Sequence, residues 1–138
     1  MQDAPQSKNF VFKLDVLFED DYLAAIHKPA GLLVNGNSFK TIANALTQNI
    51  TRSTLSDVTK PQPVHRLDFP TTGILLIGKT SSSIRALNTL FKNRAIKKTY
   101  YAVTIGVMQP EGIITTIVDG KTSKSKYKVL QTVDSVRF

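Results

Sequence analysis

The residues best suited to chemistry stand together in one short segment, His-Arg-Leu-Asp at positions 65–68, just before a Pro-Thr-Thr-Gly turn and the apolar run ILLIG. Charged side chains beside a buried strand cost free energy unless they are paired or belong to a site. Asp68 is the only acidic residue between Asp57 and Glu111, an interval rich in Lys and Arg. Cations favour an ionised carboxyl group, which can act as a nucleophile or as a base. Asp68 is therefore the candidate catalytic residue.

A structural role for Asp68 stays open from the residue types alone. Asp often accepts backbone N–H hydrogen bonds in turns such as the Thr-Thr-Gly turn that follows it. Structural ion pairs also place carboxylates among cations. Asp68 is thus either part of a structural pair or turn, or the acidic group at the mouth of a site.

Metal and cofactor sites find little support. The sequence has two His and no Cys, whereas zinc requires three or four closely held ligands. Neither Gly-x-x-x-x-Gly-Lys nor Gly-x-Ser-x-Gly occurs, which argues against a phosphate-binding loop and a serine-hydrolase elbow. We expect no metal and no cofactor.

The net charge of +8 is confined to the second half of the chain. Residues 1–60 contain six Lys or Arg and six Asp or Glu, whereas residues 61–138 contain twelve and four. A one-sided basic field attracts polyanions, so we expect contact with nucleic acid through Arg94, Lys97 and Lys98. The alternative is a charged face that serves solubility.

Two adjacent tyrosines lie in the segment KKTYYAVTIG at positions 97–106, which we predict to be a strand. Neighbouring side chains on a strand face opposite sides of the sheet. One of Tyr100 and Tyr101 would then join the core, and the other would offer an aromatic surface among lysines, suited to stacking on an unpaired base. Alternatively, both are ordinary packing residues.

Periodicity predicts the elements that would position these residues. The predicted order is two strands, a helix, a strand, a helix and then three strands with short connections. This order favours one α+β domain with a mixed, largely antiparallel sheet and flanking helices. We expect ILLIG to be a central strand buried on both faces, and the second helix to be capped by Ser81 or Ser82. The predicted elements are strands at 16–18, 22–26, 74–78, 98–106, 112–120 and 125–133, helices at 41–50 and 81–96, and a loop at 51–63.

The ends of the sequence add three expectations. Residues 1–9 are polar, without the pattern of a secretory signal, and are predicted to be a disordered leader. No apolar run approaches the roughly 20 residues that span a bilayer, so a cytoplasmic protein without membrane contact is expected. The chain stops soon after its last predicted strand, so residues 1–138 are predicted to form a single, partial domain.

Three motifs together resemble the RluA-type pseudouridine synthases. HRLDFPTTG is similar to their catalytic motif His-Arg-Leu-Asp-x-x-Thr-Ser-Gly, with Thr72 in place of the Ser. IHKPAGLLV at 26–34 resembles their Lys-Pro-x-Gly loop, which is thought to be structural, and KKTYYAV at 97–103 resembles their Lys-x-Tyr-x-Ala strand. The motifs occur in the family's order, and the resemblance spans about residues 14–130.

The resemblance implies isomerisation of uridine to pseudouridine in structured ribosomal or transfer RNA, without a cofactor. Asp68 would be the nucleophile that detaches uracil from its ribose. Tyr100 would stack on the target uracil, and Arg66 would fill the place that the flipped nucleotide leaves in the RNA. His65 and Thr72, in the same motif, would contact the substrate.

One departure from the family pattern gives a second interpretation. The family continues into a Thr-Gly-Arg-x-His-Gln-Ile-Arg segment whose basic residue pairs with the catalytic Asp, and the sequence ends before that point. The alternative is therefore a catalytically inactive, RNA-binding paralogue or truncated domain.

Overall fold

The computed structural model describes residues 9–134, so the predicted leader lies outside the described residues except for Asn9. The chain divides into two compact units, one reaching to Lys98 and one beginning at Thr99. Each is described by itself, and the assignment of residues 1–138 to one partial domain stays a prediction.

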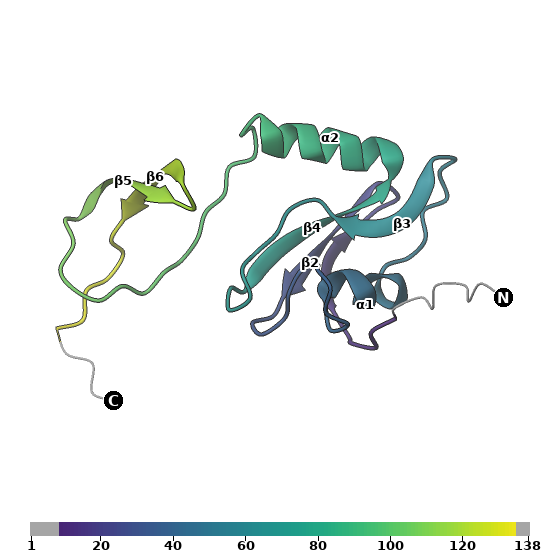
Figure 1. Cartoon of the computed structure of the whole chain (residues 1–138), viewed down its shortest axis with the longest axis horizontal. Coiled ribbons are helices and arrows are strands. Elements are labelled where there is room, and N and C mark those ends of the chain that lie inside the picture. The colour runs from purple at the N-terminus through teal and green to yellow at the C-terminus, as the bar shows by residue number, and fades with distance from the viewer. Residues whose placement is uncertain (1–8, 135–138) are drawn as a thin grey trace. The chain divides into compact units, whose positions relative to one another are not determined.

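The first unit contains a four-stranded sheet and two helices (Figure 1). The sheet has the order β1-β2-β4-β3, and every neighbouring pair is antiparallel. The prediction of an α+β fold with a largely antiparallel sheet and flanking helices is confirmed. The elements are β1 (Asp15–Glu19), β2 (Leu23–Lys28), α1 (Ile42–Asn49), β3 (Val58–Pro63), β4 (Gly73–Thr80) and α2 (Ser81–Lys92).

The two faces of this sheet are covered by different helices (Figure 1). Alternation along the strands sends Ile26, Leu75 and Ile77 to one face, where they are buried with Ile42 and Leu46 of α1. Burial of such side chains stabilises the fold by roughly 1.5–3 kcal/mol each. On the other face, α2 crosses the end of β4.

The contact between β4 and α2 depends on a glycine. A Cβ atom at Gly78 would collide with the side chain of Ile84 on α2. The start of β4 lies beyond α2, and Ile74 there is 61% exposed. The prediction that ILLIG is buried on both faces is therefore wrong at its first residue, because the helix covers only part of the strand.

The second helix begins at the predicted residue, Ser81, but its N-cap lies one residue before the predicted caps, Ser81 or Ser82. Thr80 is the N-cap, and its hydroxyl and the Ser83 hydroxyl each accept the other residue's backbone N–H. The helix ends at Lys92 rather than 96, because Arg94 takes a left-handed conformation with φ 54°. On this helix Leu87 is buried, whereas Leu90 is 44% exposed.

The segment predicted as a loop at 51–63 contains the strand β3. Pro61 and Pro63 suggested a loop, because proline cannot donate to a ladder. Strand β3 lies at the edge of the sheet, where proline is tolerated, and its register against β4 shifts between Val58 and Gln62.

The second unit contains the hairpin of β5 (Glu111–Val118) and β6 (Lys121–Lys128). The two connecting residues, Asp119 and Gly120, have φ of 50° and 74°, the positive values that a type I′ hairpin turn requires. Two of the three late strands are thus confirmed, but the turn lies within the strand predicted at 112–120, and β6 begins and ends earlier than 125–133.

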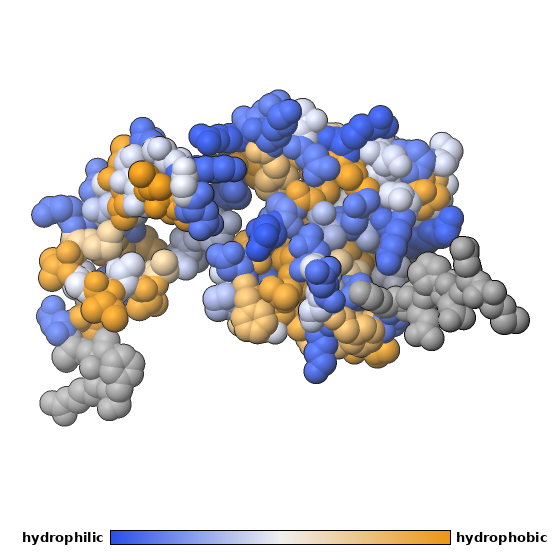
Figure 2. Space-filling view, viewed as in Figure 1, coloured by the Kyte–Doolittle hydropathy of each residue, from blue (hydrophilic) through white to orange (hydrophobic). Residues whose placement is uncertain are grey.

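The strand predicted at 98–106 is absent from the structure. Its backbone pairs with no other strand, and Val103 and Ile105 are fully exposed. An alternating apolar pattern forms a strand only where a ladder partner and a covering layer are present. Figure 2 shows apolar side chains on the surface of this unit. No helix among residues 9–134 is long and apolar enough to cross a membrane.

Candidate active site

Asp68 lies on the loop that joins β3 to β4, and its side chain is exposed. Leu67, the residue before it, is buried in the main hydrophobic core. The loop therefore inserts one apolar side chain into the core and turns the neighbouring carboxylate outwards. Burial of Leu67 fixes where Asp68 stands.

A buried lysine holds the other side of this loop. Lys28, the last residue of β2, is fully buried. Its ammonium donates hydrogen bonds to the carbonyl oxygens of Pro29 at 2.9 Å, Thr71 at 2.8 Å and Phe69 at 3.3 Å. The N–H of Gly31 also donates to the Phe69 carbonyl, at 2.9 Å. The Lys-Pro-x-Gly loop thus binds the backbone on the C-terminal side of Asp68.

The charge on Lys28 also bears on Asp68. Burial lowers the pKa of Lys28, because desolvation disfavours the ammonium, and the nearby Asp68 carboxylate opposes this shift. The buried lysine thus interacts electrostatically with the exposed carboxylate, while its hydrogen bonds go to carbonyl groups rather than to an acid. Sequence reasoning treated this lysine as structural and did not place it beside Asp68.

Asp68 could have a structural role in an ion pair or in the turn that follows it, and its contacts bear on both. Among the described residues the one salt bridge joins Lys79 to Glu19, at 2.8 Å, so Arg66 and Asp68 form no ion pair. The turn that follows is closed by the Thr71 N–H donating to the backbone carbonyl of Asp68, at 3.0 Å, rather than to its carboxylate. Arg66 and Thr72 are both exposed. The carboxylate is therefore committed to neither structural role.

His65 connects the loop to β4 and α2. Its Nε2 accepts the Leu76 N–H at 3.0 Å, which assigns the ring proton to Nδ1. The ring stacks on Phe91 with centroids 4.6 Å apart. Burial lowers the pKa of His65, and the charge of Lys98 lowers it further, against a hydrogen bond with the Arg66 backbone that raises it. His65 is therefore neutral at pH 7, and these contacts position the loop.

The predicted RNA-binding residues Arg94, Lys97 and Lys98 follow α2, and all three are exposed. Lys98 is close enough to His65 to affect its pKa, so this basic segment reaches the Asp68 loop within the first unit. A polyanion attracted to these cations would be brought near the carboxylate.

Tyr100 and Tyr101 belong to the second unit. They are 57% and 88% exposed, and neither lies on a strand. The prediction that one of them joins the core through strand alternation is wrong, because the segment has no ladder partner. The stacking role of Tyr100 stays a prediction.

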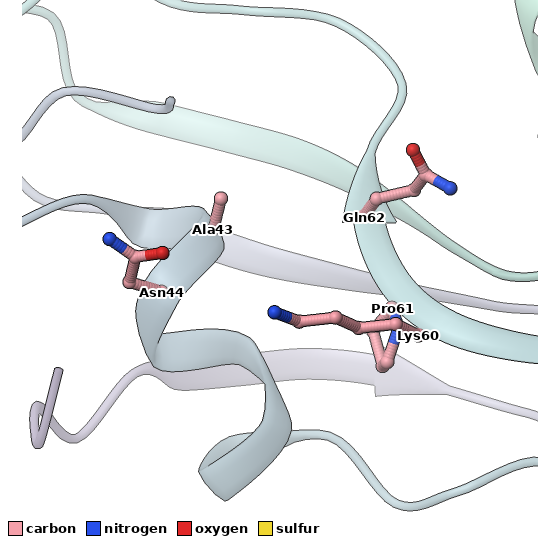
Figure 3. Close-up of a pocket in the computed structure, with 5 residues that line it drawn as sticks. All are labelled: Ala43, Asn44, Lys60, Pro61 and Gln62. Carbon is pink, nitrogen blue, oxygen red and sulfur yellow. The ribbon is translucent and has the colours of Figure 1, made fainter. Parts of the chain in front are cut away.

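A shallow cavity of about 230 Å³ lies elsewhere in the first unit, between the first turn of α1 and β3. Figure 3 shows the Lys60 side chain extending from β3 towards the helix. The Asn44 amide there is already bonded to the carbonyls of Ser38 and Phe39. This cavity contains none of the predicted site residues. In the part of the chain that the structure describes, no three His, Cys, Asp or Glu side chains gather as metal ligands would.

The chain is similar to RNA pseudouridine synthases. A protein-family model described as RNA pseudouridylate synthase matches residues 22–136. Ribosomal large subunit pseudouridine synthase D of Nitrosomonas europaea is 35% identical over 135 residues, covering 86% of this chain and 39% of the relative. tRNA pseudouridine synthase C of Pectobacterium carotovorum is 33% identical over 101 residues, covering 73% of this chain and 26% of the relative.

A solved structure has the same fold. The human RNA pseudouridylate synthase domain containing 4 aligns with a TM-score of 0.60 and 25% identity, over 86% of this chain and 48% of that one. The chain thus spans less than half the length of each of these three proteins.

Proposed function

The chain belongs to the RNA pseudouridylate synthase family, and we propose that it isomerises uridine to pseudouridine in structured ribosomal or transfer RNA. The observation that carries the proposal is the presentation of Asp68. Its carboxylate is exposed, free of ion pairs with Arg66, and set on a loop that Leu67 and Lys28 fix from both sides. Such a fixed and unengaged carboxylate suits a nucleophile.

The reaction requires one bond to be exchanged for another at the same sugar. The bond between uracil N1 and ribose C1′ breaks, and a bond between uracil C5 and C1′ forms. C5 loses a proton and N1 gains one, so atoms and electrons balance without a redox partner. In our proposal Asp68 is the nucleophile that detaches the base, and no cofactor takes part. Lys28 holds the loop through hydrogen bonds to its carbonyls, and its charge interacts with the Asp68 carboxylate.

The target uridine must leave the RNA helix before Asp68 can reach it. We assign Arg66, which is exposed beside Asp68, to fill the space that the flipped nucleotide vacates. Tyr100 would stack on the uracil, an interaction worth roughly 1–3 kcal/mol per base. Thr72 and His65 would contact the substrate from the same loop, with His65 neutral. Arg94, Lys97 and Lys98 would contact phosphates, and the site of action would be the cytoplasm.

The test is the conversion of uridine in unmodified transcripts. The chain is incubated with large-subunit ribosomal RNA and, separately, with transfer RNA, which are then digested to nucleosides and separated by liquid chromatography. We expect pseudouridine in at least one of the two. Binding of both RNAs without pseudouridine in either would overturn the proposal and favour the RNA-binding chain without turnover.

A further inference from the structure

The hairpin of β5 and β6 has two chemically different faces. Its register is unbroken, with Lys124 opposite Thr115, Lys126 opposite Ile113 and Lys128 opposite Glu111. Because strand side chains alternate with period two, these three lysines lie in a row on one face, roughly 6.8 Å apart from one to the next. All three are exposed.

The opposite face carries a packing contact instead of a row of charges. Tyr127 lies over Gly112, so closely that a Cβ atom on this glycine would meet the tyrosine ring at 2.8–2.9 Å. Ser123 and Ser125 share this face, and Lys121, at its end beside the turn, is its single lysine. The glycine and the tyrosine thus pack together on the face opposite the lysine row.

The charges of the row are unevenly balanced. No carboxylate stands opposite Lys124 or Lys126, whereas Glu111 stands directly opposite Lys128. None of the three lysines forms a salt bridge among the described residues. Opposite charges on facing strand positions attract each other, so Glu111 offsets part of the Lys128 charge. The uncompensated centre of the face is Lys124 and Lys126.

We propose that this lysine face, defined as Lys124, Lys126 and Lys128, binds the phosphate backbone of the RNA substrate. The inference rests on the proposed function, since it takes the polyanion to be the RNA that is modified. A row of evenly spaced, unpaired cations matches a polymer with repeated negative charges better than a single anion. Threonines and isoleucines beside the row add no opposing charge, so the contact would be independent of base sequence.

The test compares two lysines on the same strand that face opposite ways. Binding of a fluorescein-labelled stem–loop RNA to the full chain is measured by anisotropy over a range of salt concentrations. Lys126→Ala should flatten the slope of log affinity against log salt by about 0.7, which corresponds to roughly a fivefold loss at about 0.1 M salt. Lys121→Ala removes the same charge from the other face and should leave the slope unchanged.

Two more variants keep the test sharp. Lys126→Arg retains the charge and should bind as the unaltered chain does, so a loss seen only with Ala is not a folding defect. Glu111→Gln removes the one carboxylate on the lysine face and should raise affinity. Equal losses with Lys121→Ala and Lys126→Ala would overturn the inference, because net charge alone would then explain binding. Unchanged affinity in both would overturn it as well and would leave the face to an acidic protein partner.

The same variants separate this inference from the proposed function. At RNA concentrations below saturation, Lys126→Ala should convert uridine more slowly, in proportion to its loss of affinity, whereas Lys121→Ala should convert uridine at the unaltered rate. If the unaltered chain makes no pseudouridine but still binds RNA through Lys126 and not Lys121, the proposed function fails and the lysine face stands. If conversion is normal and Lys126→Ala binds normally, the reverse holds.

Discussion

Replacement of Lys28 by Met tests how the fold presents Asp68. Met has an unbranched side chain one atom shorter than that of Lys, and it cannot donate the three hydrogen bonds to the carbonyls of Pro29, Phe69 and Thr71. The Phe69 carbonyl keeps its bond from the Gly31 N–H, so two carbonyls lose their partner.

Hydrogen bonds to a charged group contribute about 1.5–3 kcal/mol each, so two of them amount to roughly 3–6 kcal/mol. Burying the ammonium has a cost of its own, which its lowered pKa reflects and which Met removes. We therefore expect Lys28→Met to lower the free energy of unfolding by about 2–4 kcal/mol. With a slope of about 2 kcal/mol per M, the midpoint of urea unfolding falls by roughly 1–2 M.

The control is Lys13→Met, which removes an exposed lysine from the same unit and should change stability by less than about 0.5 kcal/mol. Under conditions where both variants are folded, Lys28→Met should still bind RNA but should convert uridine more slowly, since the Asp68 loop has lost its support. Equal unfolding midpoints for the two variants would show that Lys28 does not hold this loop.

Three further predictions concern the first unit. Folding lowers the pKa of His65, so the unfolded state binds more protons than the folded state between that pKa and 6.5. The unfolding free energy therefore falls as pH drops through this window. In His65→Phe, the urea midpoints at pH 7.5 and pH 5 should differ less than in the unaltered chain. Gly78→Ala should cost about 1–3 kcal/mol by overpacking against Ile84, and a second change, Ile84→Ala, should cost less in that background than alone. Asn49→Ala should lower the thermal midpoint, because the Asn49 side chain accepts the Leu14 N–H and donates to the Phe12 carbonyl, and each bond is worth about 1 kcal/mol. An unchanged midpoint would contradict this.

Local patterns were enough to predict most of the first unit. The helical spacing at 41–50 and the apolar run at 74–78 correspond to α1 and β4, because both elements bury side chains at the period that the sequence displays. The Asp-Gly pair that separates β5 from β6 also carries its own turn geometry, but the strand predicted at 112–120 wrongly included it.

The failures arise where a distant partner decides. Strand β3 contains two prolines and is held by pairing with β4, which composition does not reveal. Residues 98–106 have the alternation of a strand and yet lack a ladder, so Val103 and Ile105 stay exposed. One error has a local cause: the N-cap is Thr80, which forms reciprocal hydrogen bonds with Ser83, whereas Ser81 and Ser82 were predicted because serine is also a good N-cap residue.

The candidate site shows the same division. The motif indicates Asp68 as the candidate, but the contacts that fix its loop join Lys28 to Phe69 and Thr71, which are 41 and 43 positions further along the chain. One signal could have found them: Lys28 continues the alternation of Ala24 and Ile26, both fully buried, and so had to face the core. A buried lysine needs partners, and the carbonyls of the adjoining loop supply them.

The claim that Asp68 is the nucleophile for uridine isomerisation is tested by the variant Asp68→Asn. Its pseudouridine yield is compared with those of the unaltered chain and of Asp15→Asn, which changes another exposed carboxylate in the same unit. Asp68 makes no hydrogen bond through its carboxylate among the described contacts, so Asn should leave the urea midpoint and RNA affinity nearly unaltered. We predict that Asp68→Asn forms no pseudouridine whereas Asp15→Asn matches the unaltered chain. Pseudouridine formation by Asp68→Asn at the unaltered rate would contradict the claim.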